Sequence, residues 1–187
     1  MAALWQDTRV TVLLADYASA DAAGKINMIG AGYVLAGWDS GTNSTAPMHV
    51  AVIMDVAGRH AGEQFTFELE LRDTSLSEVV SLPGPTGQSQ ALRVSQLALA
   101  ERPMVPGLHL PQDVPCRVQL TLGFPNGLPL VPGHHYSWQL KIDGQRRPNW
   151  SADFFVPDVP KGPIFGGPAG PADIPGVEPS VGEVDEG

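Results

Sequence analysis

The stretch that decides the fold is VTVLLADYASADAAGKINMIGAGYV, residues Val10–Val34. Two apolar runs, Val10–Ala18 and Ile26–Val34, flank the polar segment Ser19–Lys25. An apolar run, a short polar break and a second apolar run predict a hairpin of strand, turn and strand. Both alternating faces of the first run are largely apolar, which predicts an inner strand covered on two sides.

The chain after this hairpin offers more strands. Met48–Val56 is apolar at nearly every position and is predicted to be internal, whereas Gln64–Asp73 alternates between apolar and polar residues, which predicts one wet face. Thr74–Leu82 fits either one helical turn or a short strand at Glu78–Leu82. Further strands are predicted at Ala91–Ala100, Arg117–Phe124, His134–Asp143 and Trp150–Val156.

Two irregularities are visible in this part of the chain. The apolar phase slips near Ser95–Gln96, which predicts a bulge. The segment Arg102–Pro115 holds four prolines and cannot lie in an inner strand. About eight or nine short strands without a convincing long helix predict an all-β fold, an antiparallel β-sandwich.

The sequence divides into three parts. Residues 1–9 form a lead-in, in which Leu4 and Trp5 are expected to pack against the body or a partner, and residues 10–156 form the sandwich domain. Residues 157–187 hold seven prolines, seven glycines, six acidic residues and one lysine. Such a segment builds no core of its own and is expected to be an extended, acidic C-terminal arm.

Two interpretations of the arm remain open. It is a solvated tail that keeps the protein soluble, or it lies along a groove of a neighbour and binds through isolated apolar anchors. The anchors would be Val159, Ile164, Phe165, Ile174, Val177, Val181 and Val184.

Charge and composition exclude several classes of protein. The chain carries 20 acidic and 11 basic residues with no basic stripe, which argues against nucleic-acid binding. Arg146–Arg147 is the only adjacent basic pair and is interpreted as a solvated turn. Cys116 is the single cysteine, so no internal disulfide forms. Neither a signal peptide nor a run of ~20 apolar residues is found, and the chain is expected to stay in the cytosol and off the membrane.

The sequence offers no catalytic constellation and no cofactor motif. The histidines show none of the spacings of metal sites, and on a strand the adjacent His134 and His135 point to opposite faces. Cys116 is interpreted as a buried small hydrophobe. The five histidines are His49, His60, His109, His134 and His135.

Two further groups are weighed against structural roles. Asp16 and Asp21, with Lys25 nearby, fit calcium ligands or an acid–base pair, but the favoured interpretation is an inward Asp16 that satisfies turn amides and an Asp21 that begins the turn. Gly30 and Gly32 are predicted to mark a bulge or close packing inside a strand.

Four aromatic residues fit a sugar-binding face, because rings stack on pyranose faces, although on alternating strands such rings are more often core. They are Trp38, Tyr136, Trp138 and Trp150.

Three segments carry a resemblance: LLADYASADAAGKINMIGAGY (Leu13–Tyr33), LTLGFPNGLPLVPGHHYSWQLKIDG (Leu120–Gly144) and WSADFFV (Trp150–Val156). Their patterns LADYA…D..GK.N.IG.G and Y.W.L.IDG resemble a family of short, uncharacterised all-β proteins of actinobacteria and actinobacteriophages. The resemblance implies a compact all-β domain and assigns no functional residue. It does not cover the arm.

Two functions are therefore expected. The first is a non-enzymatic accessory protein of a phage particle, a capsid decoration or minor capsid protein in the virion, made in the host cytoplasm. Its partners would be the major capsid protein or copies of itself, so that it is oligomeric or lattice-bound. The alternative is a cytosolic bacterial module that binds a sugar, a peptide or a protein partner.

Overall fold

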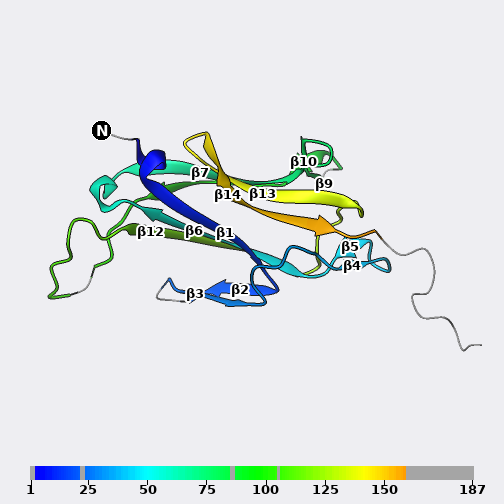
Figure 1. Cartoon of the computed structure of the whole chain (residues 1–187), viewed down its shortest axis with the longest axis horizontal. Helices are drawn as coiled ribbons and strands as arrows, with labels where there is room; N and C mark the ends of the chain where they lie inside the picture. The colour runs from blue at the N-terminus through cyan, green and yellow to red at the C-terminus, as the bar shows by residue number, and fades with distance from the viewer. Residues whose placement is uncertain (1–2, 22–23, 85–86, 105, 159–187) are drawn as a thin grey trace, which may run out of the picture.

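The computed structural model describes residues 3–21, 24–84, 87–104 and 106–158. These residues form an all-β fold of antiparallel sheets with two short 3-10 helices, as the sequence predicted (Figure 1). The elements are η1 (Leu4–Asp7), β1 (Thr8–Ala15), β2 (Tyr17–Ala20), β3 (Ile26–Ile29), β4 (Trp38–Asp39), β5 (Ser44–Thr45), β6 (Met48–Val56), η2 (Gly58–His60), β7 (Gln64–Asp73), β8 (Glu78–Val79), β9 (Ser81–Pro83), β10 (Ser89–Ala91), β11 (Arg93–Leu99), β12 (Cys116–Phe124), β13 (His134–Ile142) and β14 (Gln145–Val156).

Two sheets form the sandwich. One has the order β1-β6-β12, and the other has the order β11-β7-β13-β14 with β8 on β7. Figure 1 shows them as two layers. Their inner faces pack together in one core, because alternate residues of each strand point to the same side. Residues that are 0% exposed come from both sheets, among them Val50, Val52, Leu69, Leu71, Trp138 and Leu140.

The strand Met48–Val56 is β6, with the predicted bounds, and it lies between β1 and β12. The prediction that the first strand is covered on two sides is wrong for its first half. β1 is an edge strand of its sheet, and Arg9 and Thr11 are exposed while Val10 and Val12 are buried. Apolar content on both faces indicated burial, but only the face toward the second sheet is covered over that half.

The predicted hairpin of Val10–Ala18 with Ile26–Val34 exists only in its central part. β1 ends at Ala15 and pairs with β6, whereas β2 and β3 form a separate two-stranded ribbon. The ribbon lies over the outer side of the three-stranded sheet in Figure 1, where Ile26 and Met28 pack against a small alanine cluster. That cluster consists of Ala15, Ala18 and Ala51.

Gly30 and Gly32 follow β3 rather than lying inside a strand, so the predicted bulge is wrong. Both have positive φ angles, 63° and 86°, which glycine adopts without strain. The alternative of close packing holds at Gly30, because a Cβ there would clash with the side chain of Asp16.

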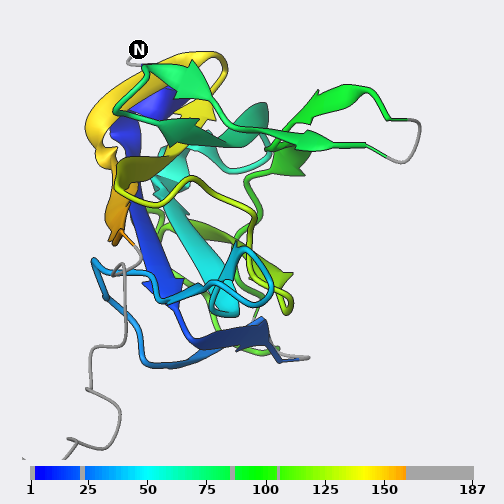
Figure 2. The same ribbon diagram turned by 90° about the vertical axis from the view of Figure 1, so that its right-hand side faces the viewer.

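The described residues contain fourteen strands, more than the predicted eight or nine, because several have only two to four residues. Glu78–Leu82 takes the strand alternative, as β8 and the start of β9. The hairpin β9–β10 projects from the body in Figure 2. The predicted bulge at Ser95–Gln96 is wrong, since β11 pairs with β7 in unbroken register. The segment Arg102–Pro115 contains no strand among its described residues, as its prolines predicted.

Candidate binding site

A wide bulge in β14 shapes the most distinctive site of the described surface. Lys141 pairs with Arg146 and Gln139 pairs with Ser151, so the four residues Arg147–Trp150 lie opposite the single residue Leu140. Pro148 has no N–H for a ladder and is tolerated in such a bulge. The bulge therefore opens a hollow in the surface of the sheet.

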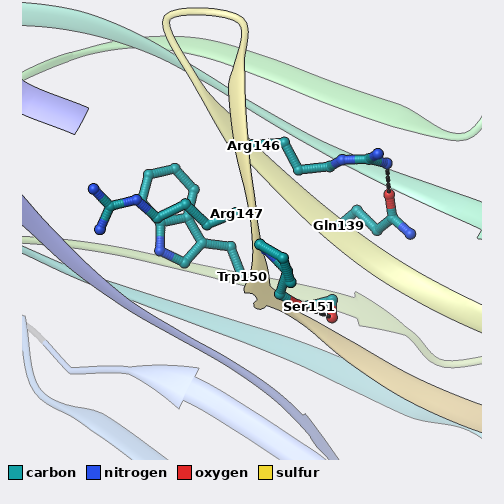
Figure 3. Close-up of a pocket in the computed structure, with 6 residues that line it drawn as sticks. Gln139, Arg146, Arg147, Trp150 and Ser151 are labelled. Carbon is teal, nitrogen blue, oxygen red and sulfur yellow. Dashed lines mark hydrogen bonds between the residues drawn. The ribbon is translucent and has the colours of Figure 1, made fainter. Parts of the chain in front are cut away.

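This hollow, here called the arginine hollow, has a volume of about 390 Å³. Its lining residues are Gln139, Arg146, Arg147, Pro148, Trp150 and Ser151. Figure 3 shows that the side chains of Arg146 and Arg147 leave β14 in opposite directions, as adjacent strand residues do. The two guanidinium groups thus flank the hollow instead of converging on one point, and Trp150, 1% exposed, fills the interior beneath it.

Arg147 connects β14 to the N-terminal lead-in. Its guanidinium lies 5.3 Å from the ring centroid of Trp5 and 5.4 Å from that of Trp150, and Nη2 donates to the carbonyl of Gln6 at 2.8 Å. Leu4 is buried and Trp5 packs against the core, which confirms the predicted packing of the lead-in. The interpretation of this arginine pair as a solvated turn is wrong for Arg147, because two tryptophan rings hold it.

Arg146 is exposed, and its Nη1 donates to Oε1 of Gln139 at 2.9 Å. Among the described residues, no carboxylate forms an ion pair with Arg146 or Arg147. A guanidinium carries five N–H donors, and only one of each is used in these hydrogen bonds. Unused donors therefore remain beside the hollow, where they can bind carboxylate or phosphate oxygens.

A second group of cations on the same sheet behaves differently. Glu70 is 1% exposed and accepts hydrogen bonds from Arg72 at 3.2 Å, Arg93 at 3.3 Å and Lys141 at 2.9 Å. Burial alone would raise the pKa of Glu70, but the hydrogen bonds from Lys141 and Arg72 outweigh burial and lower this pKa. We call these residues, with Glu68, the Glu70 network, and its charges are matched within the fold.

His60 forms a third charged cluster near the lead-in. Its side chain is 5% exposed, and its two ring nitrogens lie 3.0 Å from Oδ2 of Asp7 and 3.0 Å from Oε1 of Glu63. The hydrogen bond with Asp7 raises the pKa of His60 against the opposing effect of burial, and Glu63 raises it further. Arg59 also pairs with Asp7, and the His60 ring lies between the two carboxylates.

The adjacent histidines lie on opposite faces, as predicted. Nδ1 of His134 lies 2.6 Å from Oδ2 of Asp73, whereas the ring of His135 packs on Phe155 at 4.7 Å. The other oxygen of Asp73 accepts backbone N–H groups of the following turn, at 2.9 Å and 3.1 Å. The described residues hold no group of three or more His, Cys, Asp and Glu that is suited to a metal ion.

The predicted structural roles of several residues are confirmed. Cys116 is 0% exposed, and burial raises the pKa of its thiol. Oδ1 of Asp21 accepts the backbone N–H of Lys25 at 2.8 Å, as expected of a residue that begins a turn.

The inward orientation expected for Asp16 is wrong, since this residue is exposed and its carbonyl lies 3.0 Å from Nδ1 of His49.

The aromatic residues do not form a sugar-binding face. Tyr136, Trp138 and Trp150 are 2%, 0% and 1% exposed, and Trp38 is half-buried against the core. Their rings belong to the core, which was the favoured alternative. Nε1 of Trp138 is the one fully buried side-chain nitrogen or oxygen among the described residues that lacks a hydrogen-bond partner.

The described surface also carries an open strand edge. β11 is the last strand of its sheet, and Leu97 and Leu99 on it are 67% and 41% exposed. Ala100 exchanges hydrogen bonds with Glu63 and Gly62 on the β7 side, so the odd-numbered residues of β11 turn their backbone groups to the free edge. A strand edge of this kind can pair with another chain.

The predicted anchors of the arm lie outside the described residues: Val159, Ile164, Phe165, Ile174, Val177, Val181 and Val184. Comparison of the chain with protein-family models, curated proteins and solved structures gave no match. In the described part of the chain, no helix is long and apolar enough to span a membrane.

Proposed function

We propose that this protein is a non-enzymatic accessory protein of a phage particle, a capsid decoration or minor capsid protein. It attaches to the particle's protein lattice through its sandwich surface and its C-terminal arm, and its partners are the major capsid protein or copies of itself. The observation that carries the binding function is the arginine hollow, which presents unmatched guanidinium groups on a chain with a net charge of −9. The particle setting rests on the resemblance of the sequence to actinobacteriophage proteins.

The site chemistry favours binding over catalysis. Asp73 and Glu70 are buried acids, but each is held by partners of its own fold and neither is left to move a proton. Catalytic acids and bases need a pKa tuned toward the working pH, whereas the pKa of Glu70 is lowered. Arg146 and Arg147 hold their charge at any working pH and supply hydrogen bonds and attraction.

A second contact comes from the free edge of β11. Its exposed leucines and unpaired backbone groups suit an extended segment of a partner, which would add a strand to the sheet. Each contact is modest, and a repeated lattice multiplies modest contacts through avidity.

In the alternative function, a cytosolic binding module, the ligand would be a peptide or a protein partner. The arginine hollow would bind either of them equally well. Sugar binding loses support, since three of the four rings that would stack on a sugar are buried and Trp38 is half-buried against the core.

The test is the composition of phage particles. Particles from a host that expresses the full chain are purified by density gradient, with Arg146→Glu as the hollow variant and Arg9→Glu, an exposed arginine on β1, as the matched control. We expect the wild type and the Arg9 variant on the particle and a loss of at least about ten-fold in occupancy for the Arg146 variant. Absence of the wild-type chain from particles would contradict the particle assignment, and equal occupancy of all three would contradict the role of the hollow.

A further inference from the structure

We propose that the arginine hollow of one copy binds the acidic C-terminal segment Val177–Gly187 of a second copy. This inference rests on the proposed function only in taking the hollow as a recognition site. It identifies the occupant of that site as a segment of the same polypeptide.

The shape of the hollow indicates the kind of ligand. The two guanidinium groups lie on opposite sides of β14 in Figure 3, so they do not chelate one small anion. They suit an extended ligand whose carboxylates are spaced along a chain and cross the bulge from one side to the other. Arginine forms its strongest hydrogen bonds with such carboxylates.

The C-terminal segment has this chemistry. Its sequence VEPSVGEVDEG contains Glu178, Glu183, Asp185 and Glu186 and has no lysine or arginine. Residues 1–156 hold 14 of the 20 acidic residues, but the structure pairs no described carboxylate with Arg146 or Arg147. The charges of the segment and of the hollow are therefore complementary.

The arm is long enough to reach the hollow of another copy. The arginine hollow lies near the start of β14, whereas the described chain ends at Asp158, beyond the other end of this strand (Figure 1). At about 3.3 Å per residue, the twelve residue steps from Arg146 to Asp158 span about 40 Å. The twenty-five steps from Asp158 to Glu183 would span about 78 Å in an extended chain at about 3.1 Å per residue. This reach exceeds the length of β14, so the arm can leave its own copy. An arm that instead folds back onto the hollow of its own copy would leave the protein monomeric, which is a result that overturns the inference.

The resulting contact is head-to-tail. The hollow and the arm are different surfaces, so each copy gives one arm and receives another, and the contact generates rings or chains of copies. A ring or chain of copies also suits a repeating particle surface.

The test uses the full-length chain and two complementary variants. The hollow variant is Arg146→Glu with an intact arm, and the arm variant carries E178Q, E183Q, D185N and E186Q with an intact hollow. Arg9→Glu is the charge control, and an unchanged urea midpoint verifies that each variant folds. Sedimentation velocity at low salt measures association of each protein alone and of the two variants mixed at equal concentration.

We expect concentration-dependent association of the wild type and of the Arg9 variant. The association constant should fall at least about ten-fold for each broken variant alone, and an equimolar mixture should restore a 1:1 complex. Restoration in the mixture is diagnostic, because only the arm variant has a working hollow and only the hollow variant has a working arm.

Three results would overturn the inference. They are a monomeric wild type at all concentrations, association that persists in the Arg146 variant, and a mixture that stays monomeric. Occupancy on particles separates this inference from the proposed function. Occupancy that still depends on Arg146 without self-association overturns only the inference, and self-association by a chain absent from particles overturns only the particle assignment.

Discussion

The Glu70 network and the arginine hollow lie on the same five-stranded sheet, and both are built from cations. In the Glu70 network, Arg72, Arg93 and Lys141 surround a carboxylate that is 1% exposed. In the arginine hollow, Arg146 donates to a neutral amide and Arg147 stacks on two tryptophan rings. One group of charges is matched within its own fold, and the other has no carboxylate partner among the described residues.

The difference shows how a charged side chain that stabilises the fold can be distinguished from one that is available to bind a ligand. A buried ion that loses its partner is costly, so a matched network contributes to folding. An exposed guanidinium without a carboxylate partner contributes little to folding and keeps most of its donors for a ligand. The comparison therefore predicts opposite responses to mutation in the two clusters, in stability for one and in binding for the other.

The largest stability effect is expected at Glu70. The substitution Glu70→Gln leaves three cations around a neutral, buried amide and should lower the free energy of unfolding by about 3 kcal/mol. Urea unfolding measures it, with Glu68→Gln as the matched control. Glu68 is 23% exposed in its side chain, so its loss should cost less than about 1 kcal/mol. Equal losses for the two variants would show that the network is not a buried, matched cluster.

The two arginines of the hollow should differ from each other. Arg147→Ala removes the contacts with Trp5 and Trp150 and the hydrogen bond to Gln6, and should cost about 1–2 kcal/mol of unfolding free energy. Arg146→Ala should stay within about 0.5 kcal/mol of the wild type, because this side chain is exposed. Urea midpoints compare the two directly. A larger loss for Arg146 would assign it a structural role and weaken the contrast with Glu70.

A smaller, pH-dependent effect is expected at His60, the other matched cluster. The pKa of His60 is raised in the folded protein, so its protonation stabilises the fold. This contribution is fully present below the unfolded pKa of about 6.5 and is lost as the pH rises through the higher folded pKa.

The charged groups that face this ring are Asp7, Glu63 and Arg59. The difference in unfolding free energy between wild type and His60→Gln should therefore shrink between pH 6 and pH 9. A difference that grows with pH would contradict a pKa of His60 that its carboxylate neighbours raise.

The sequence predicted the strands whose pattern is local. Met48–Val56 and Gln64–Asp73 were visible because most of their apolar residues are buried. The wet face predicted for Gln64–Asp73 is wrong at Glu70, which is 1% exposed because three cations of the same sheet surround it. The pairing of the first strand was not visible, because an apolar run does not identify its partner strand. Thr8–Ala15 pairs with β6 and not with the strand that follows it in the sequence. The apparent phase slip at Ser95–Gln96 reflects an exposed edge strand, on which polar and apolar residues are equally tolerated.

The arginine hollow was missed for a related reason. In RRPNW, the adjacent arginines and Pro148 indicate a turn, so the last strand was predicted to begin at Trp150. The structure continues β14 back to Gln145 through the bulge. Whether an arginine finds a carboxylate depends on residues distant in sequence, and Arg147 meets Trp5 from the other end of the chain. The pair of basic residues was the only signal of the site in the sequence.

The most direct test of the arginine hollow as a carboxylate-binding site is a calorimetric titration. The synthetic peptide VEPSVGEVDEG is titrated into the full-length arm variant, whose own acidic segment is neutralised, and into the same chain carrying Arg146→Glu. We predict saturable 1:1 binding that weakens with added salt and is lost at Arg146→Glu, with folding unchanged in both proteins. Equal binding by both proteins, or no binding to the intact hollow at low salt, would contradict the account.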